Sequence, residues 1–317
     1  MKYYIGVDGG GTKTAICAAA ADSSVLLTEM TTSSSWREYG VDHVVENIRR
    51  VIGDFRLGTN GSIAGIATGL PCFGESEEGD RELEKAIHAA FPGIPIYITN
   101  DVEVGWAGSL CLSPGVNVVA GTGAIAFGKN ESKETARSGG WSEFFGDEGS
   151  CYWVGWKTMQ LFSKQADGRI PKDELYTIIR RELKLKNDFD FIDLIYREYM
   201  TNRDKVAAIQ ILAREAAFAG SPSAKALYEE AAGELCSLVA AIRNRLRFKH
   251  QPFPVSYSGG LYRAGELVLP YFFTGIEALG GKPVTPKFEP MYGALLLAFE
   301  LNYPEGLPNL QKRLEAI

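Results

Sequence analysis

The sequence predicts an α/β protein of two domains, each built on a mixed β-sheet. The chain has 317 residues, more than one hydrophobic core usually serves, so two domains are expected. Short β-rich runs alternate with segments of helical apolar spacing, which is typical of sheets covered by helices. A unit of strand, glycine turn and strand occurs twice, at Tyr3–Ala21 and at Val116–Lys129, and this repetition indicates a duplicated fold.

The first half opens as a meander. Only Asp22-Ser23-Ser24 separates the second strand from the third, which is too short for a crossover helix. The strands expected in this half are Tyr3–Val7, Thr14–Ala21, Val25–Thr31, Ile63–Leu70 and Ile94–Thr99. The helices expected from apolar spacing are Val41–Ile52, Arg81–Phe91 and Val102–Leu110.

A break at Ser113-Pro114-Gly115 precedes the second half, which is rich in helices. Its expected strands are Val116–Ala120, Ala124–Lys129 and Val255–Ser258. Its expected helices are Gly149–Ala166, Lys172–Leu183, Phe189–Tyr199, Asp204–Phe218, Ala224–Lys249 and Pro290–Leu301. We therefore expect an N-terminal domain over 1–113 and a C-terminal domain over 114–317, with the last helix able to return to the first domain.

Composition and charge narrow the class of partner. The formal net charge of −6 repels phosphate backbones and anionic lipid surfaces, so neither nucleic acid nor a membrane is an expected partner. The five cysteines are scattered without metal-ligand spacing, which favours reduced thiols. No apolar run reaches the ~18 residues of a membrane span, and a cytoplasmic location is expected.

The first glycine turn, Asp8-Gly9-Gly10-Gly11-Thr12-Lys13-Thr14, has the composition of a phosphate loop. Converging N–H donors require backbone conformations that residues with a Cβ rarely adopt. A Walker A loop is excluded because Thr12 separates Gly11 from Lys13 and a strand follows. A Rossmann fingerprint is excluded because Thr14 stands where the third glycine belongs. A plain glycine hairpin remains the alternative, and Lys13 would then be an exposed hairpin lysine.

Two further glycine turns follow in the second half. Gly121-Thr122-Gly123 lies between two expected strands, and Ser258-Gly259-Gly260 ends another. Each alone fits an ordinary turn. The order of all three, with Asp8 after the first strand and Asp101 after a later one, favours phosphate binding.

One segment carries a specific resemblance. It is Gly139-Gly140-Trp141-Ser142-Glu143-Phe144-Phe145-Gly146-Asp147-Glu148-Gly149-Ser150-Cys151-Tyr152-Trp153, which resembles the GGW-x4-GDEGSAYW signature of N-acetylglucosamine kinases. Over nearly its whole length the chain resembles the N-acetylglucosamine kinase and BadF/BadG/BcrA/BcrD ATPase family of the actin, sugar kinase and Hsp70 superfamily. The resemblance implies two actin-like (ribonuclease H-like) domains with a nucleotide and substrate cleft between them. It also implies ATP and Mg²⁺ as cofactors.

The resemblance also implies roles for the three turns and for Asp101. Gly9, Gly10, Gly11 and Thr12 would hold the terminal phosphates, with Lys13 as a further contact; Thr122 and Gly123 would form the second phosphate loop, and Gly259 and Gly260 the adenosine loop. Asp8 would partner the Mg²⁺ through water. Asp101 follows a buried strand, where α/β sites form, and would be the general base and a sugar ligand. The alternative for Asp101 is an N-cap of the following helix, a role that Asn100 could equally fill.

The sugar-side residues implied by the resemblance are Gly140, Trp141 and Asp147. An indole offers an apolar face to a pyranose ring, and a carboxylate accepts hydroxyl hydrogens. The alternatives are core packing for Trp141 and helix capping for Asp147 and Glu148; Glu148 could also assist the metal. Ser35 stands where the family's amino-sugar kinases have an asparagine, which leaves the identity of the sugar open.

The expected function is therefore ATP-dependent phosphorylation of an amino sugar, with N-acetylglucosamine at its 6-hydroxyl as first choice. Glucosamine, N-acetylmuramic acid and N-acetylmannosamine are the other candidates. One rival is the ATPase that activates CoA-ester dehydratases through a cysteine-held cluster, but no cysteine pair follows Gly121-Thr122-Gly123. Another is a non-catalytic sugar-sensing regulator, but no DNA-binding segment precedes the first strand. The sequence leaves a homodimer open.

Overall fold

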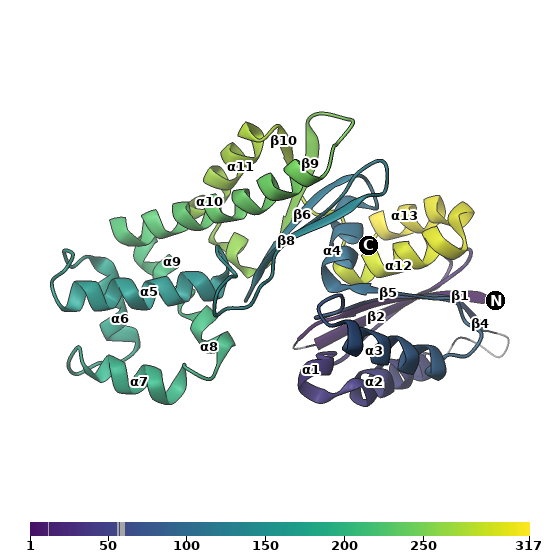
Figure 1. Ribbon diagram of the computed structural model, residues 1–317, viewed down its shortest axis with the longest axis horizontal. Coiled ribbons are helices and arrows are strands. Elements are labelled where there is room, and N and C mark those ends of the chain that lie inside the picture. The colour runs from purple at the N-terminus through teal and green to yellow at the C-terminus, as the bar shows by residue number, and fades with distance from the viewer. Residues whose placement is uncertain (12, 56, 58–60) are drawn as a thin grey trace. The chain divides into compact units, whose positions relative to one another are not determined.

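A computed structural model describes the chain except for residues 12, 56 and 58–60. It divides into two compact units (Figure 1). Unit 1 comprises Met1–Ser113 and Thr285–Ile317, and unit 2 comprises Pro114–Val284. The expected C-terminal domain ran to residue 317, whereas the segment from Thr285 onward belongs to unit 1.

Unit 1 is built on a five-stranded mixed sheet in the order β3-β2-β1-β4-β5. Its strands are β1 (Lys2–Gly9), β2 (Lys13–Ala20), β3 (Leu26–Thr32), β4 (Ser62–Leu70) and β5 (Ile96–Asn100). Strands β1 to β3 form the antiparallel meander, while β4 and β5 run parallel to β1. The carboxyl ends of β1, β4 and β5 therefore lie at one edge of the sheet.

Helices cover both faces of this sheet (Figure 1). On one face lie α1 (Trp36–Tyr39), α2 (Val41–Asp54) and α3 (Glu77–Ala90), and on the other α4 (Asp101–Leu110), α12 (Pro290–Asn302) and α13 (Leu307–Glu315), with a 3₁₀ turn at Pro304–Gly306. Helix α2 buries Val44, Ile48, Val51 and Ile52 at helical spacing against the sheet. The last helix, α13, was not expected from the sequence.

Helix α12 packs unusually close to its neighbours because glycines remove side chains at the contacts. A Cβ at Gly293 would lie 2.0 Å from the carbonyl oxygen of Val104 in α4. A Cβ at Gly6 in β1 would lie 2.4 Å from the backbone nitrogen of Leu295. The thiol of Cys17 also donates to the carbonyl of Met291 at 3.1 Å. Backbone thus approaches backbone on both sides of α12, and this fixes α4 against the sheet.

Unit 2 repeats the same sheet. Its strands are β6 (Gly115–Ala120), β7 (Ala124–Lys129), β8 (Thr135–Gly139), β9 (Phe253–Ser258) and β10 (Gly281–Val284). Their order is β10-β9-β6-β7-β8, with β6 to β8 antiparallel and β9 and β10 parallel to β6. Order and directions match those of unit 1 strand for strand. The predicted α/β fold with a duplicated mixed sheet is confirmed, although β8 and β10 were not expected.

The helices of unit 2 are α5 (Cys151–Ala166), α6 (Glu174–Glu182), α7 (Asp190–Glu198), α8 (Arg203–Ala208), α9 (Gln210–Phe218), α10 (Pro222–Arg245) and α11 (Leu269–Ala278), with the 3₁₀ helix η1 at Gly260–Leu267. The single helix expected over Asp204–Phe218 is wrong. At Ile209 the backbone N–H donates to the carbonyl of Val206, three residues back, and this tighter turn separates α8 from α9. In the described part of the chain, no helix combines the length and apolar character needed to cross a membrane.

Replacing Gly293 with Ala should destabilise unit 1. The added methyl group meets backbone atoms of α4, which cannot move aside as a flexible side chain would, so we expect a loss of about 2–3 kcal/mol in the free energy of unfolding. Urea denaturation measures it. Gly53→Ala is the matched control, because a Cβ there meets nothing within 4 Å on an exposed turn of α2; it should be neutral or stabilise by about 0.5 kcal/mol. Equal effects of the two changes would contradict the close-packing argument.

Candidate active site

The first glycine turn joins β1 to β2 and is held by backbone hydrogen bonds. The N–H of Gly10 donates to the carbonyl of Lys13 at 2.9 Å, and the N–H of Ser34 donates to the carbonyl of Gly10 at 3.0 Å. A Cβ at Gly9 would lie 2.9 Å from side-chain atoms of Leu70 and Ser34, while a Cβ at Gly11 would meet nothing within 4 Å. The turn is thus anchored at its base and open at its tip. Thr12, the fourth expected phosphate ligand, lies outside the described residues.

Two carboxylates meet at the sheet edge beside this turn. Asp8 lies at the carboxyl end of β1, in register with Gly69 of β4, and Gly69 is in register with Thr99 of β5. Asp101 follows β5 directly. Burial, together with the charge of Asp101, raises the pKa of Asp8 to about 7, and Lys13 opposes the rise. A raised pKa on a carboxyl that lies beside a second carboxyl is typical of a site that binds a cation or moves a proton.

Asp101 does not cap α4. The side chain of Asn100 accepts from the N–H of Val102 at 3.0 Å and its amide donates to the carbonyl of Phe73 at 2.7 Å. The alternative role is therefore filled by Asn100, and Asp101 lies in the first turn, where the helix dipole favours an anion.

Ser35 directly follows Ser34, whose N–H bonds to the carbonyl of Gly10 in the first glycine turn. Its N–H donates to the hydroxyl of Ser33 at 3.0 Å, and its hydroxyl makes no capping bond to α1. The neighbouring Ser34 bonds both to Gly10, as above, and through its hydroxyl to that of Thr14. The residue expected to contact sugar thus follows a segment that is fixed to the first turn.

Unit 2 brings its three predicted segments together. The N–H groups at the start of α5, those of Cys151 and Tyr152, donate to the carbonyls of Gly121 and Thr122 at 2.8 and 3.3 Å. Gly259 has φ +110°, and a Cβ there would lie 2.4 Å from the carbonyl oxygen of Ala120, so only glycine allows this approach.

The turn between β6 and β7 leaves donors available. The N–H of Gly121 donates to the carbonyl of Gly123 at 2.9 Å. Among the described residues, the N–H groups of Thr122 and Gly123 meet no acceptor. Two adjacent unpaired donors on a glycine turn are what an anionic oxygen requires.

Asp147 holds the end of this turn through its buried carboxylate. Its carboxylate, 3% exposed, accepts from the N–H of Ala124 at 3.1 Å and from the guanidinium of Arg203 at 2.5 Å. Burial raises the pKa of Asp147, and the Ala124 N–H and Arg203 oppose that rise. Arg203 also lies 3.5 Å from Glu143. The carboxylate expected to bind sugar is thus engaged by the β6–β7 turn, through Ala124, and by an arginine that the sequence did not single out.

The capping alternative for Asp147 and Glu148 is wrong, because the side chain of Ser150 accepts from the N–H of Trp153 at 3.0 Å and caps α5. Glu148 is exposed. Core packing is also wrong for Trp141, which is 71% exposed. Gly140 has φ +70°, and a Cβ there would lie 2.7 Å from the side chain of Ile125, so glycine permits the turn that presents Trp141.

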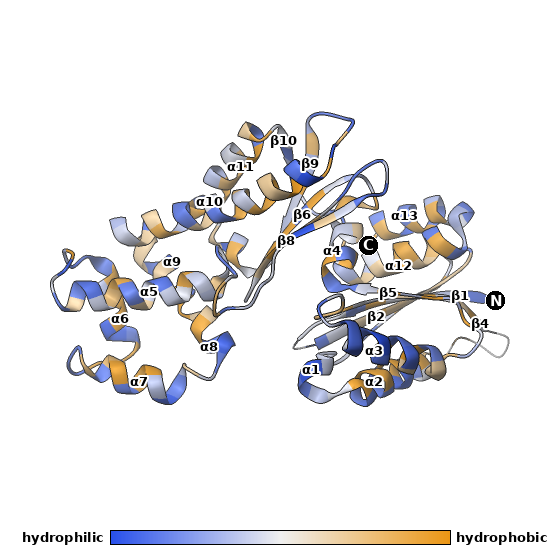
Figure 2. Ribbon diagram, viewed as in Figure 1, coloured by the Kyte–Doolittle hydropathy of each residue, from blue (hydrophilic) through white to orange (hydrophobic). Residues whose placement is uncertain are grey.

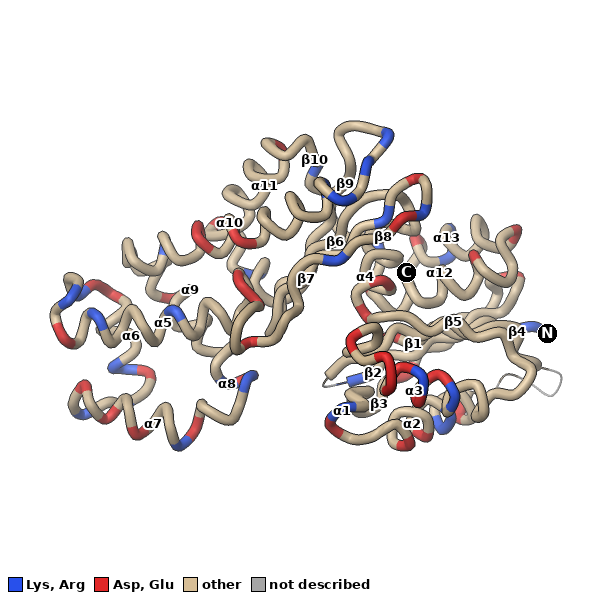
Figure 3. Tube along the Cα trace, in the orientation of Figure 1, with Lys and Arg blue, Asp and Glu red and all other residues tan. Residues whose placement is uncertain are grey.

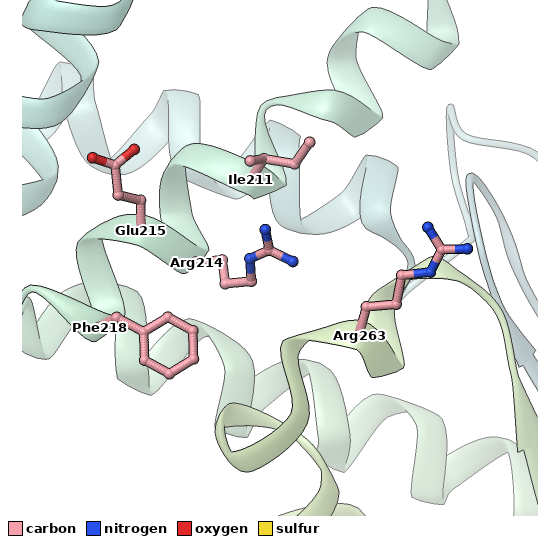
Figure 4. A pocket seen from close by; sticks show the side chains of 5 residues that line it. All are labelled: Ile211, Arg214, Glu215, Phe218 and Arg263. Carbon is pink, nitrogen blue, oxygen red and sulfur yellow. The ribbon is translucent and has the colours of Figure 1, made fainter.

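A cavity of about 410 Å³ beside η1 was not expected from the sequence (Figure 4). It is lined by Ile211, Arg214, Glu215 and Phe218 of α9 and by Arg263 of η1. The guanidinium of Arg214 and the ring of Phe218 face the space from one side and Arg263 borders it from the other, while Glu215 points away (Figure 4) and pairs with Arg181. Helix η1 begins at Gly260, so Arg263 lies three residues beyond the third glycine turn.

Known proteins resemble this chain over most of its length. The model described as the BadF/BadG/BcrA/BcrD ATPase family matches residues 5–298. An N-acetylmuramic acid/N-acetylglucosamine kinase of Clostridium acetobutylicum is 30% identical over 94% of this chain and 98% of its own. An N-acetyl-D-glucosamine kinase of Dictyostelium discoideum is 30% identical over 82% of this chain and 85% of its own.

Solved structures agree with the fold. A structure from Chromobacterium violaceum, described as a candidate N-acetylglucosamine kinase, superposes with a TM-score of 0.72 at 25% identity, covering 94% of this chain and 99% of that one. A ROK family glucokinase of Streptomyces griseus superposes with a TM-score of 0.56 at 16% identity, covering 95% and 99%; this second likeness shows the fold alone.

The raised pKa of Asp8 gives a prediction for the protein without nucleotide or metal. Because the folded-state pKa of about 7 exceeds the unfolded value, the folded state holds its proton longer, and Asp8 costs stability as the pH rises from about 4 to 8. In urea denaturation at pH 8, Asp8→Asn should therefore have a free energy of unfolding about 2 kcal/mol higher than that of the parent. The figure is below the full value of the pKa shift because water reaches part of the carboxylate. The difference between the two proteins should disappear near pH 4. A gap that is constant with pH would contradict the assignment.

Proposed function

This chain belongs to the BadF/BadG/BcrA/BcrD ATPase family, and on that premise we propose that it is an ATP-dependent kinase that phosphorylates N-acetylglucosamine at its 6-hydroxyl. The observation that carries the proposal is the equivalence of the two hairpin turns. The β1–β2 turn and the β6–β7 turn occupy the same place in duplicated sheets, and each is a glycine turn suited to phosphate oxygens. Asp101 stands at the sheet edge beside the first.

The residues present fit a Mg²⁺ ion. Asp8 and Asp101 offer hard oxygen donors, and the mutual repulsion expressed in the pKa of Asp8 would be relieved by a cation. The described residues contain no cluster of three or more His, Cys, Asp or Glu able to hold a metal by themselves. That suits Mg²⁺, which usually takes one or two carboxylates and completes its shell with phosphate oxygens and water. When bound, the ion would neutralise charge on the phosphates.

Asp101 is the proposed general base. It would accept the proton of the sugar hydroxyl as the oxygen–phosphorus bond forms, and it would orient that hydroxyl beforehand. The Gly9–Gly11 turn would lie against the terminal phosphates, with the N–H of Gly10 kept in its bond to the carbonyl of Lys13. The N–H groups of Thr122 and Gly123 would bind phosphate oxygens from the second turn. Asp8 would hold the hydrated metal. Lys13 would add a positive charge at the first turn.

The choice of sugar follows the named relatives. Both are kinases of N-acetylglucosamine, and the clostridial protein is also named for N-acetylmuramic acid. Trp141, exposed beside Gly140, would stack on the sugar ring or its acetyl methyl. Ser35 would contact the 2-substituent. Asp147 can accept sugar hydroxyls only if Arg203 gives up its hydrogen bond, so we propose that sugar binding competes with that ion pair.

The cavity beside η1 is the proposed site of the adenine base. Its volume lies within the ~300–1,000 Å³ range of small-molecule sites. Guanidinium planes stack on aromatic rings, and Arg214, Arg263 and the ring of Phe218 supply such surfaces. Gly259 and Gly260 lead directly into η1. If the adenine ring binds in the cavity, the phosphates of the same nucleotide would therefore extend toward the neighbouring glycine turn.

Asp101→Asn tests the reaction and its base together. ADP release with Mg-ATP should be stimulated by N-acetylglucosamine over glucosamine, N-acetylmannosamine and glucose, with N-acetylmuramic acid as the second acceptor to try. The asparagine variant should fold normally and lose about 10²–10⁴-fold in turnover, because it cannot take the proton.

Asp42→Asn is the matched control for that experiment, since Asp42 also lies in the first turn of a unit 1 helix but is exposed. It should keep full turnover. ADP release that no sugar stimulates would overturn the kinase proposal and favour an activating ATPase. Near-normal turnover by Asp101→Asn would overturn the base assignment alone.

Arg263→Ala tests the proposed adenine site. Loss of the stacking surface should raise KM for ATP by about tenfold and leave KM for the sugar unchanged. Arg243→Ala, at an exposed position in the last turn of α10, is the control and should change neither constant. A rise in KM for sugar with none for ATP would place the cavity outside the nucleotide site.

A further inference from the structure

Helix α7 presents an apolar stripe to solvent. Phe189, at its N-cap, is 80% exposed, Ile192 53%, Tyr196 72% and Met200, just beyond its end, 49%. Their spacing of three, four and four residues places all four on one side of the helix axis. Figure 2 shows orange residues between blue ones along α7. The sequence had indicated no such stripe, because helical spacing alone does not say which face is buried.

The opposite side of α7 holds it to the rest of unit 2. Phe191 is buried and its ring centroid lies 4.6 Å from that of Phe162 in α5. Leu194 and Ile195 are half-buried and pack against the same core. Because the inner face of α7 already packs against the core, the outer stripe is not needed for the fold of unit 2.

The stripe is large enough to matter. At roughly 150–250 Å² for a large side chain, these exposed fractions amount to about 400–600 Å² of contiguous apolar surface, the size at which a patch on a soluble protein marks a contact. A stable interface buries about 800 Å² per partner. The stripe therefore has the dimensions of an apolar interface centre that still needs a polar rim.

The charges beside the stripe indicate what the partner is. Asp193 and Arg197 lie along one edge of it, one helical turn apart, and pair with each other at 2.6 Å; Figure 3 shows both signs along α7. When a helix packs antiparallel on a copy of itself about a two-fold axis, like edges meet with their directions reversed. Asp193 would then face the partner's Arg197, and Arg197 the partner's Asp193.

We propose that α7 is the self-association surface of this protein, and that a second copy of the chain packs its own α7 antiparallel against it. The stripe is self-complementary in both respects that an isologous contact requires: the apolar residues meet apolar residues, and the edge charges meet opposite charges. The inference concerns unit 2 alone and does not depend on the proposed kinase activity.

Mass measurement by light scattering tests the proposal. The parent should have twice the 34.6 kDa chain mass. Ile192→Glu should yield the single-chain mass, because it places a charge at the apolar centre in both copies, and we expect the dissociation constant to rise about 100-fold or more. Leu301→Glu is the matched control, since Leu301 is equally exposed at 53% but lies on α12; it should stay dimeric. A monomeric parent, or a dimer unaffected by Ile192→Glu, would overturn the proposal.

Charge reversal tests the antiparallel arrangement. Asp193→Arg and Arg197→Asp should each weaken self-association, because like charges then face each other across the two-fold axis. Mixing the two variants should restore dimers that contain one chain of each, since every facing pair is again opposite in sign. Both side chains are exposed, so the fold should survive either change. Failure of the mixture to form mixed dimers would exclude this arrangement of the helices.

Discussion

A buried carboxylate fixes the geometry on which the β6–β7 glycine turn of unit 2 depends. Asp147 receives the N–H of Ala124, the first residue of β7, and thereby holds the end of the β6–β7 turn in place. With that end held, the carbonyls of Gly121 and Thr122 accept hydrogen bonds from the start of α5, which fixes the rest of the turn. A buried charge of this kind is tolerated only when it is paired, which is the part that Arg203 plays.

Unit 1 reaches the corresponding arrangement by a different route. Its turn is held by a backbone hydrogen bond from Ser34 to the carbonyl of Gly10. The acidic groups of unit 1 stand at the sheet edge, where β1, β4 and β5 end together. The position of Asp101 depends in turn on α4, and α4 is fixed by the backbone contact with Gly293 of α12. The duplicated sheets are thus equivalent in topology and unequal in the polar groups that stand at their turns.

The sequence predicted the strands that carry a β-rich run, including the largely exposed β3, and it missed two short strands that lack one. Strand β8 is a five-residue run that includes Arg137 and Ser138, and β10 is four residues with a proline, so neither carries the β-rich pattern on which strand prediction rests. Both lie at sheet edges, where pairing with a single neighbour decides the structure. The break at Ile209 was missed because apolar spacing runs through it unbroken.

The residues of the candidate site also fall into those that the sequence could predict and those that it could not. The glycine turns could be found from the sequence because close approach of a backbone to another backbone, or to an anion, leaves no room for a side chain. Glycine is therefore required at such positions, as at Gly9 and Gly259. Arg203, Arg214 and Phe218 could not be found, because each lies on an ordinary helix and acquires its role only from what the fold places opposite. The same limit applies to α7: Phe191 and Ile192 are adjacent and both apolar, and only the packing of Phe191 against Phe162 shows which of them faces the core and which is left for another molecule.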